Sequence, residues 1–452
     1  MRLAIVGAGI SGIGAAWLLS KDNTVDIYES EAALGGHART VDLTSDGVTF
    51  PTDAGFQVFN QRTYPNLLRF FERLDIKHSE TDMSFSVRVD SENIEWSGTS
   101  LNSVFAQRKN VTNPRFLRML ADVVRFSRDA DRLLADPTID ELTLGQLLER
   151  EGYSTVFTDW YLIPMGDAIW STPPGKMLDY PAATFLHFCD NHGLLHITGK
   201  PMWMSVIGGS RTYVERAARS FSGEVHTNEP AEQIERTGAG VKIHTARRVK
   251  EYDAVVIAAH APDTLRLLGD GATPDERDVL SAFSYQPNPV VLHTDTAFMP
   301  QERRAWASWN WYAASGDSLK DALVLTYWIN NLQLLPSKVR PVMETLNANR
   351  PFAEGTVLDR MVFDHPLFTT EAIHAQRRVP ALQGVGGVWF AGAWQRYGFH
   401  EDGLLSGVRV AESLGAALPW AGELDESRTK ELGGARAPGG VPVLEPGSEG
   451  IA

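Results

Sequence analysis

The chain has 452 residues, of which 43% are hydrophobic and 22% are charged, and its formal net charge is −14. This length and composition are typical of a globular protein with two domains and a large buried core. The negative charge argues against nucleic acid as a partner, because the protein would repel its phosphates. The one cysteine, Cys189, excludes an internal disulfide and fits a reducing compartment, so we expect a cytoplasmic protein.

The sequence predicts no membrane span, since it contains no run of about 18 apolar residues. Residues 3–19 superficially resemble a signal peptide, but the glycines within this stretch and the acid-ended strand after it are unlike one. The net charge disfavours tight docking on anionic lipid. A local basic patch that includes Arg108, Lys109, Arg115 and Arg118 nevertheless leaves a transient contact with a membrane surface open.

The first predicted elements are an apolar strand and a helix, joined by the glycine motif G-x-G-x-x-G. In such a motif Gly7 makes the tight turn, Gly9 lets the backbone approach a pyrophosphate, and Gly12 lets the helix pack on the strand. The helix N-terminus, with Ile10 and Ser11, would then direct free N–H groups and a partial positive charge at the phosphates.

The second predicted strand, residues 25–28, ends at Glu29. Glu29 follows the glycine motif near the spacing of about 20 residues at which a carboxylate accepts hydrogen bonds from ribose hydroxyls. Strand, turn, helix, strand and acid in this order predict a dinucleotide site, against the alternative of a glycine-rich turn without a nucleotide. No second motif of this kind follows a strand in the middle of the chain, and the glycines of residues 384–387 precede theirs. We therefore infer that the chain has no nicotinamide-binding domain.

The middle of the chain alternates apolar and charged residues over 112–150, which predicts an amphipathic helix. Residue types that ligate metals then occur close together, at His187, Cys189, His192 and His196. Gly193 interrupts a single helical face there and the spacing matches no standard zinc pattern, so we expect no bound metal. Residues 253–259 and 325–329 predict strands.

Near the C-terminus an apolar strand ends at Gly392, and a further helix is predicted shortly after it. His400 precedes this helix and can exchange a proton near neutral pH, so it is the candidate acid or base. The alternative is that Asp402 caps the helix and His400 packs against it.

Several segments after the second strand carry glycines and acids in a recognisable order. They are Leu34-Gly35-Gly36-His37, Asp53-Ala54-Gly55-Phe56, Gly208-Gly209-Ser210, Glu229-Pro230-Ala231 and Trp389-Phe390-Ala391-Gly392. Through these segments, over about residues 1–415, the chain resembles the flavin amine oxidase and phytoene desaturase superfamily. The resemblance implies non-covalent FAD and an α/β fold, in which a Rossmann-like FAD-binding domain is interleaved with an α+β substrate domain of the amine oxidase and glutathione reductase type.

The resemblance also implies a set of FAD contacts beyond the glycine motif and Glu29. They are Ser30, Gly36, His37, Arg39, Gly55, Phe56, Gln57, Val58, Ala231, Ala259, Gly392, Asp402, Leu404 and Leu405. Amine oxidases commonly carry arginine at the places of Glu31 and His37, so Arg39 is the candidate that replaces this charge. Otherwise the helix N-terminus alone neutralises the pyrophosphate.

Three side chains near the C-terminus are candidate catalytic residues. The superfamily places Trp394 and Tyr397 beside the flavin, and His400 follows them directly. The other aromatic residues of the second half are expected to be core. Phe399 and His400 stand where amine oxidases carry a tyrosine, which argues against an amine oxidase.

The resemblance divides the chain into interleaved parts. We expect residues 1–75, 205–285 and 383–418 to form the FAD-binding domain, and residues 76–204 and 286–382 to form the substrate domain. Residues 419–452, rich in Gly, Pro and Glu without periodicity, are expected to be a disordered tail.

Residues 161–174 and 200–211 resemble bacterial FAD-dependent oxidoreductases that are similar to the flavoprotein region fused to plant cyclopropane fatty-acyl synthases. This resemblance implies a lipid acyl chain or another long apolar substrate. The implied reaction removes hydride from that chain or moves a double bond along it, with the flavin as hydride acceptor. Two alternatives stay open: a flavin amine oxidase that releases hydrogen peroxide, and a non-catalytic flavoprotein partner of a lipid-modifying enzyme.

Overall fold

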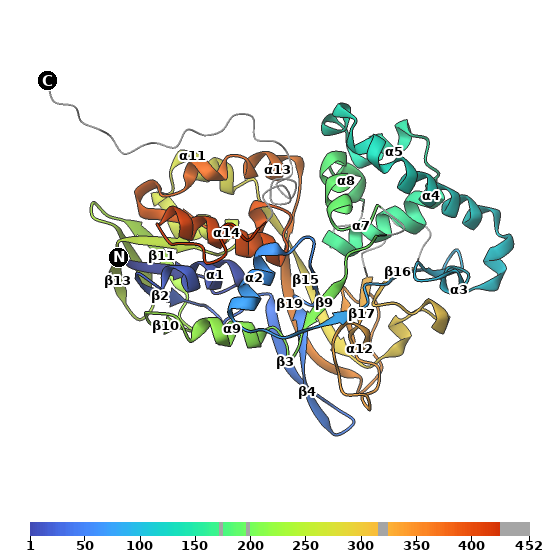
Figure 1. The fold of residues 1–452 in the computed structure, drawn as a ribbon, viewed down its shortest axis with the longest axis horizontal. Coiled ribbons are helices and arrows are strands. Elements are labelled where there is room, and N and C mark those ends of the chain that lie inside the picture. The colour runs from blue at the N-terminus through green and yellow to red at the C-terminus, as the bar shows by residue number, and fades with distance from the viewer. Residues whose placement is uncertain (171–174, 196–198, 315–323, 425–452) are drawn as a thin grey trace.

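The computed structural model describes residues 1–170, 175–195, 199–314 and 324–424. Figure 1 shows α1 and α14 in one half of the molecule, α4, α5, α7 and α8 in the other, and the long strands β15 and β19 between them. Among the described residues, no helix has both the length and the apolar character that a bilayer crossing requires.

A parallel five-stranded sheet forms the centre of the first half, in the strand order β10-β2-β1-β14-β20. Its strands are β1 (Arg2–Val6), β2 (Thr24–Tyr28), β10 (Val225–His226), β14 (Ala254–Ile257) and β20 (Val388–Phe390). Strand β14 is buried throughout, as expected for a parallel strand covered on both faces. Helices α1 (Ile10–Leu19) and α14 (His400–Ser413) pack so closely that a side chain at Gly407 would overlap the Ser11 carbonyl oxygen. The predicted Rossmann-like α/β fold is confirmed.

Two small antiparallel units and several helices complete this half. They are the sheet of β11 (Ala231–Arg236), β12 (Val241–Thr245) and β13 (Val249–Tyr252), the hairpin of β3 (Ala38–Ser45) and β4 (Val48–Gly55), and the helices α2 (Pro65–Arg73), α9 (Arg211–Ala218), α10 (Ala261–Leu268), α11 (Pro274–Leu280) and α13 (Thr370–Gln376). The hairpin brings its last residue, Gly55, beside the turn at His37.

A mixed seven-stranded sheet forms the centre of the second half, in the order β19-β15-β18-β17-β16-β7-β8. Its strands are β7 (Phe85–Val89), β8 (Ile94–Ser97), β15 (Ser284–His293), β16 (Trp309–Ala313), β17 (Val324–Trp328), β18 (Met343–Leu346) and β19 (Val357–Leu367). A small sheet in the order β5-β9-β6 lies nearby, formed by β5 (Phe59–Asn60), β6 (His78–Thr81) and β9 (Trp203–Val206). The strand predicted at 325–329 corresponds to β17.

Helices accompany the seven-stranded sheet. They are α3 (Leu101–Val104), α4 (Pro114–Leu134), α5 (Leu144–Arg150), α6 (Thr155–Phe157), α7 (Ile163–Trp170), α8 (Ala182–Asn191) and α12 (Ile329–Leu332). The single amphipathic helix predicted over 112–150 is wrong, because α4 ends before Pro137, which starts a separate 3-10 turn. Proline lacks the N–H that would continue the helix.

The end of the described chain differs from the predicted tail. Trp420 is fully buried, stacks on Trp17, and donates its indole N–H to Asn66 Oδ1 at 3.0 Å. Disorder is therefore wrong for residues 419–424, while 425–452 lie outside the described residues. The division of the chain into two interleaved domains remains our proposal.

Candidate functional site

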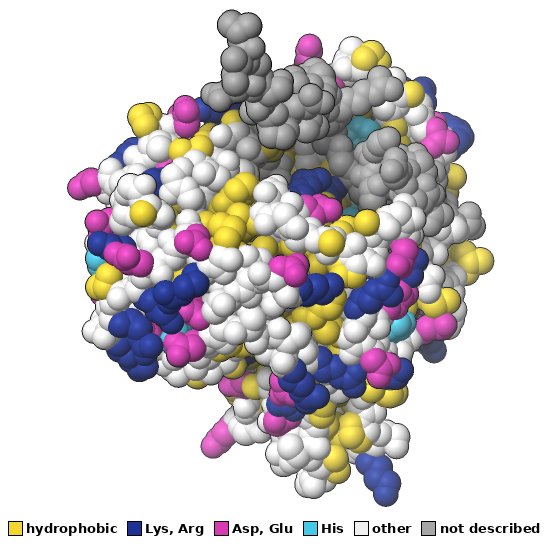
Figure 2. All heavy atoms as spheres, turned by 60° about the vertical axis from the view of Figure 1, so that its left-hand side comes forward, with side chains coloured by type: hydrophobic (Ala, Val, Ile, Leu, Met, Phe, Trp, Pro, Cys, Tyr) yellow, Lys and Arg dark blue, Asp and Glu magenta, His cyan; other side chains and the backbone are white. Residues whose placement is uncertain are grey.

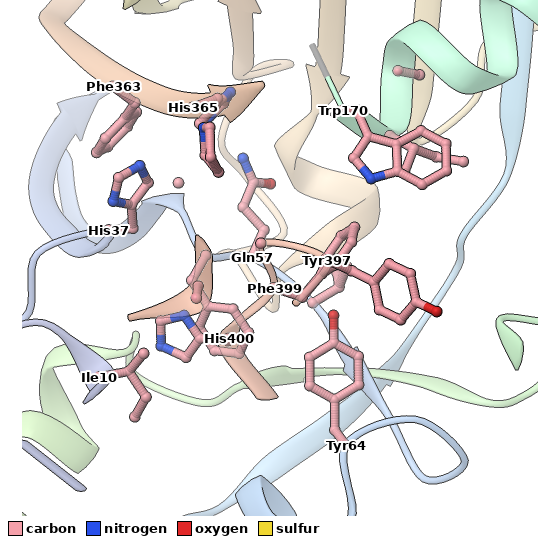
Figure 3. Close-up of a pocket in the computed structure, with 18 of the residues that line it drawn as sticks. Ile10, His37, Gln57, Tyr64, Trp170, Phe363, His365, Tyr397, Phe399 and His400 are labelled. Carbon is pink, nitrogen blue, oxygen red and sulfur yellow. The ribbon is translucent and has the colours of Figure 1, made fainter. Parts of the chain in front are cut away.

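A cavity of about 1220 Å³ is lined by the loops that follow β1, β2, β14 and β20 of the five-stranded sheet and by strand residues of the seven-stranded sheet. Ligand pockets typically measure roughly 300–1,000 Å³, so this cavity has room for more than one small molecule. Figure 3 shows part of its wall, with His37, Phe363 and His365 on one side, Tyr64, Tyr397 and Trp170 on the other, and Gln57 between them.

The three motif glycines serve three separate steric purposes. Gly7 has φ +98°, and a Cβ there would lie 2.5 Å from the Ala258 carbonyl oxygen. A Cβ at Gly12 would overlap the Gly7 carbonyl oxygen, so this position serves the packing of α1. Gly9 lines the cavity with an ordinary φ of −71°, and a Cβ there would meet no protein atom within 4 Å. The packing of the protein does not require glycine at position 9, so the open space there is available to a ligand.

Helix α1 presents its N-terminus to the cavity. Gly9 is its N-cap and no side chain accepts a hydrogen bond there, while Ile10 and Ser11 of its first turn line the cavity. The first N–H groups of a helix lack intrahelical partners and carry a partial positive charge. An anionic phosphate fits this position.

Glu29 lies at the end of β2 in a fixed orientation. Its Oε2 accepts the Ala8 N–H at 2.8 Å, and its Oε1 accepts the Glu31 N–H at 2.9 Å and the Ser30 hydroxyl at 3.1 Å. Both Glu29 and Ser30 line the cavity. A carboxylate oxygen has two lone pairs, so Glu29 can still accept hydrogen bonds from a ribose.

Three histidines surround the neighbouring part of the cavity. The ring of His37 lies 4.9 Å from Phe363, 5.7 Å from His365 and 6.4 Å from His260, centre to centre. Desolvation and these histidines lower the pKa of His37 to about 3, and desolvation lowers the pKa of His365 to about 4. His37 is therefore neutral near pH 7 and does not replace the charge of an arginine. Arg39, which is exposed and lines the cavity, keeps that predicted role.

The side chain of Gln57 extends into the cavity from the Asp-x-Gly segment (Figure 3). Its amide oxygen and nitrogen are buried and make no hydrogen bond of good geometry with the described residues, although the amide is close enough to Glu344 to lower the pKa of that carboxyl. An unsatisfied buried polar group costs about 1–3 kcal/mol. The orphan amide, the open space at Gly9 and the carboxylate of Glu29 together fit a ligand that carries phosphate, ribose and a polar ring edge, as FAD does.

Two buried carboxyl groups, those of Asp53 and Glu344, lie in or beside the segment of residues 53–57. Asp53 accepts the Ser210 N–H and hydroxyl, each at 2.8 Å, and the Thr40 hydroxyl at 2.5 Å. Burial raises the pKa of Asp53 to about 6 and that of Glu344 to about 8, although the Gln57 side chain opposes the shift of Glu344. Glu344 was not among the predicted residues, although an acid inside the apolar strand β18 is a signal that could have found it.

We expect a Glu344→Gln variant to gain thermal stability relative to the wild type as the pH rises. Folded Glu344 keeps its proton up to a pKa of about 8, whereas the unfolded chain loses it near 4.5. Between these values the folded state holds the extra proton, so wild-type stability falls with rising pH by roughly 1.4 kcal/mol per pH unit. Glutamine does not titrate. The difference in melting temperature should therefore grow from pH 5 to pH 8, and an equal difference at both contradicts a neutral Glu344.

His400 is held on two sides. Its ring stacks on Phe56 at 3.7 Å between centres, and its Nε2 shares a hydrogen bond of 2.7 Å with the Tyr213 hydroxyl. Burial lowers the pKa of His400 to about 3. A ring with so low a pKa and with Nε2 engaged by Tyr213 is a poor general base, so the geometry favours the packing alternative. Asp402 accepts the Phe399 N–H at 3.0 Å and thereby caps α14, as that alternative requires.

Most predicted site residues line the cavity. They are Gly7, Gly9, Ile10, Ser11, Glu29, Ser30, Gly36, His37, Arg39, Gly55, Phe56, Gln57, Val58, Ala259, Gly392, Trp394, Tyr397 and His400. Trp394 donates its indole N–H to the Ala259 carbonyl at 3.2 Å, so this ring fastens the wall.

Five predicted cofactor residues do not line the cavity. They are Gly12, Ala231, Asp402, Leu404 and Leu405. Gly12 lies beneath the turn, Ala231 begins β11 opposite Thr245, and Leu404 packs beside Gly14. Their predicted contacts with FAD stay a prediction.

Among the described residues, Cys189, His187 and His192 do not form a common ligand set. Cys189 is buried, its thiol pKa is raised by burial, and His187 is exposed. The ring of His192 stacks on Phe188 at 3.9 Å and its Nδ1 lies 2.9 Å from the Phe188 carbonyl oxygen. His196 lies outside the described residues.

Aromatic side chains form the far end of the cavity. They are Tyr64, Trp170, Phe188, His192, Trp203, Tyr397 and Phe399. Phe188 stacks on Phe399 at 5.0 Å and meets the edge of Tyr397 at 5.7 Å. Desolvation lowers the pKa of His192 to about 4, so its ring is neutral near pH 7. The sequence prediction did not assign Tyr64 or Phe188 to the site; the spacing of Phe188 and His192 by one helical turn is a local signal for a shared face.

Comparisons with known proteins identify a family for the chain. Residues 10–322 match the family described as flavin containing amine oxidoreductase. The carotenoid phi-ring synthase of Streptomyces griseus is 28% identical over 305 residues, 61% of this chain and 55% of the relative. The chain thus spans about half the length of that relative.

Two solved structures share the fold. Putrescine oxidase bound to putrescine is 16% identical with a TM-score of 0.64, over 92% of this chain and 100% of that chain. A fatty acid isomerase from P. acnes, which produces CLA, is 14% identical with a TM-score of 0.60, over 92% and 98%. Because the family match covers most of its length, the chain belongs to the flavin-containing amine oxidoreductases.

Proposed function

We propose that the protein is an oxidoreductase that binds FAD without a covalent bond and acts on an apolar, lipid-type acyl chain by dehydrogenation, desaturation or double-bond isomerisation. The observation that carries this proposal is one cavity with two chemically different ends. One end offers a helix N-terminus, an acid and an orphan amide, and the other is rich in aromatic side chains.

The chain's residues divide the binding of FAD between them. Glu29 would accept the ribose hydroxyls, Gly9 and the start of α1 would hold the pyrophosphate with Arg39, and Gln57 would meet the polar edge of the flavin ring. When bound, FAD supplies an acceptor for hydride from carbon. Phe56 and Gly392 line the cavity near these groups and would exclude water from the ring.

The aromatic end supports an apolar substrate. Phe188, Trp203 and Phe399 present rings to the cavity, and neutral His192 adds no charge. Burying the apolar surface of an acyl chain there gains about 25 cal/mol per Å². The names of the phi-ring synthase and the fatty acid isomerase are compatible with a lipid-type substrate.

An amine substrate is the second candidate, and one observation favours it. Glu80 and Asp82 are exposed and line the cavity, where their carboxylates would attract a cation. An amine must nevertheless enter the aromatic end uncharged to lose hydride to a flavin. A non-catalytic role beside a lipid-modifying enzyme is the third hypothesis, in which the protein changes no substrate.

Product analysis separates these three functions. We expect incubation of the yellow protein with oleic or linoleic acid, free or as a phospholipid, to yield chains with a changed number or position of double bonds by mass spectrometry. Putrescine and benzylamine should give neither aldehyde nor hydrogen peroxide. Peroxide from an amine with unchanged lipids would favour the amine oxidase, and no product from either class would favour the non-catalytic role. Heat-denatured protein is the control.

A further inference from the structure

Exposed apolar side chains are concentrated on α3, α4 and the 3-10 turn Arg108–Thr112 between them. Leu101 is 79% exposed, Val111 51%, Leu117 42% and Val124 56%. We call the exposed side chains of Leu101, Arg108, Lys109, Val111, Leu117 and Val124 the α3–α4 surface. Exposed apolar side chains gathered on consecutive elements are candidates for contact with a protein or a membrane.

The same segment is basic although the chain is acidic. Residues 101–134 contain seven Lys and Arg and three Asp and Glu, a net charge of +4 in a chain of −14. Figure 2 shows a different face, from the half with the five-stranded sheet, where basic and acidic side chains lie intermixed. The α3–α4 segment therefore differs from that face in its excess of basic side chains.

The acids near this surface leave its outer charge positive. Asp122 lies on the buried face of α4, where it pairs with Arg118 at 3.1 Å and Arg125 at 3.0 Å. Glu92 pairs with Arg115, and Asp129 pairs with Arg128 and Arg132 farther along the helix. Asp131, also near that end, is exposed.

Arg108 and Lys109 carry the unpaired charge of the surface. Arg108 donates to the Phe105 carbonyl at 2.8 Å and to the side chain of Asn102, and no carboxylate of the described residues pairs with it or with Lys109. The ring of Phe105 packs on Phe116 at 5.9 Å, which joins the end of α3 to α4. The basic and apolar groups are thus held on connected, packed elements.

This surface begins where the wall of the cavity ends. Trp96, Gly98 and Thr99 line the cavity, and the next residue, Ser100, caps α3. The exposed Leu101 therefore follows the cavity wall by two residues. A lipid beside Leu101 would therefore contact a segment that continues directly into the cavity wall.

We propose that the α3–α4 surface docks on an anionic phospholipid bilayer, with Leu101, Val111, Leu117 and Val124 in the interface and Arg108 and Lys109 against the headgroups. Basic and apolar groups on one face suit this occupant, because anionic headgroups attract Lys and Arg while apolar side chains enter the acyl boundary. The docking requires no catalysis, so it stands or falls separately from the proposed reaction.

Flotation of the full-length protein with vesicles tests the charge. The wild type should bind vesicles of phosphatidylcholine mixed with phosphatidylglycerol at least roughly ten-fold more tightly than phosphatidylcholine alone, and less tightly as salt rises. Arg108→Glu with Lys109→Glu should abolish this preference, whereas the control Arg360→Glu, at an exposed position on β19, should keep it. Failure of the wild type to bind, or equal binding by the double variant, overturns the proposal.

A fluorescent label tests the orientation. Because Cys189 is buried, Leu101→Cys and Leu334→Cys variants can each carry one environment-sensitive dye at an exposed position. The dye at 101 should shift to the blue on the anionic vesicles, and the dye at 334 should not. A shift at 334 alone, or at neither position, contradicts docking through α3–α4 and would leave an acidic protein as the partner to seek.

Discussion

A Gly9→Val variant is expected to fold like the wild type and to purify without flavin. A Cβ at position 9 would meet no protein atom within 4 Å and the backbone there has φ −71°, so we expect the fold to tolerate valine. The valine would occupy the space that the pyrophosphate needs. We expect FAD affinity to fall at least about 100-fold, which corresponds to roughly 2.7 kcal/mol.

Acid precipitation measures this result. The wild type should release FAD into the supernatant, and the variant should release little or none at an unchanged melting temperature of the flavin-free protein. Gly12→Ala is the matched control, because its methyl group overlaps the Gly7 carbonyl oxygen and should lower the stability of the fold itself. A Gly9→Val protein with full flavin occupancy contradicts the phosphate site.

The His400→Ala variant is expected to lose stability and flavin occupancy but to keep its turnover per bound flavin within about ten-fold. The substitution removes the ring that stacks on Phe56 and leaves the buried Tyr213 hydroxyl without its partner. Together these losses cost about 3 kcal/mol or more. A general base would instead cost 10²-fold to 10⁴-fold in rate.

Two further measurements separate these roles of His400. Tyr213→Phe keeps the ring of residue 213 and removes only its hydroxyl, so it should show a smaller loss of stability. Because the pKa of His400 is lowered to about 3, its ring stays neutral from pH 5 to pH 8, and the rate should show no His400 titration there. A loss of 10²-fold or more per bound flavin in His400→Ala would restore the general-base role.

The dinucleotide end could be predicted from the sequence because its constraints are local. Gly7, Gly12 and Glu29 belong to one continuous segment, and the steric and hydrogen-bonding reasons for each act within that segment. The strand just before Gly392, β20, could also be predicted from its local apolar sequence. The helix over 112–150 was predicted too long, because the apolar periodicity continues past Pro137. The backbone cannot continue as one α-helix there, and a 3-10 turn begins at that proline.

The rest of the site depends on contacts between distant segments. His37 meets His365 only because β19 lies beside the turn after the Gly-Gly pair, and Glu344 approaches Gln57 only through the pairing of β18 in the second sheet. Neither contact leaves a periodic signal. His400 was assigned as a base from its type alone, whereas its burial between two rings decides its protonation.

Anaerobic reduction of the bound flavin tests the central claim most directly. Purified protein is mixed without oxygen with oleoyl phospholipid, oleic acid or benzylamine, and the flavin absorbance is followed. We predict that a lipid bleaches the flavin, or is isomerised while the flavin stays oxidised, and that benzylamine does neither. The contradicting result is that benzylamine bleaches the flavin, while in the mixtures with lipid the flavin stays oxidised and mass spectrometry finds every lipid unchanged. That result would assign the aromatic cavity to an amine.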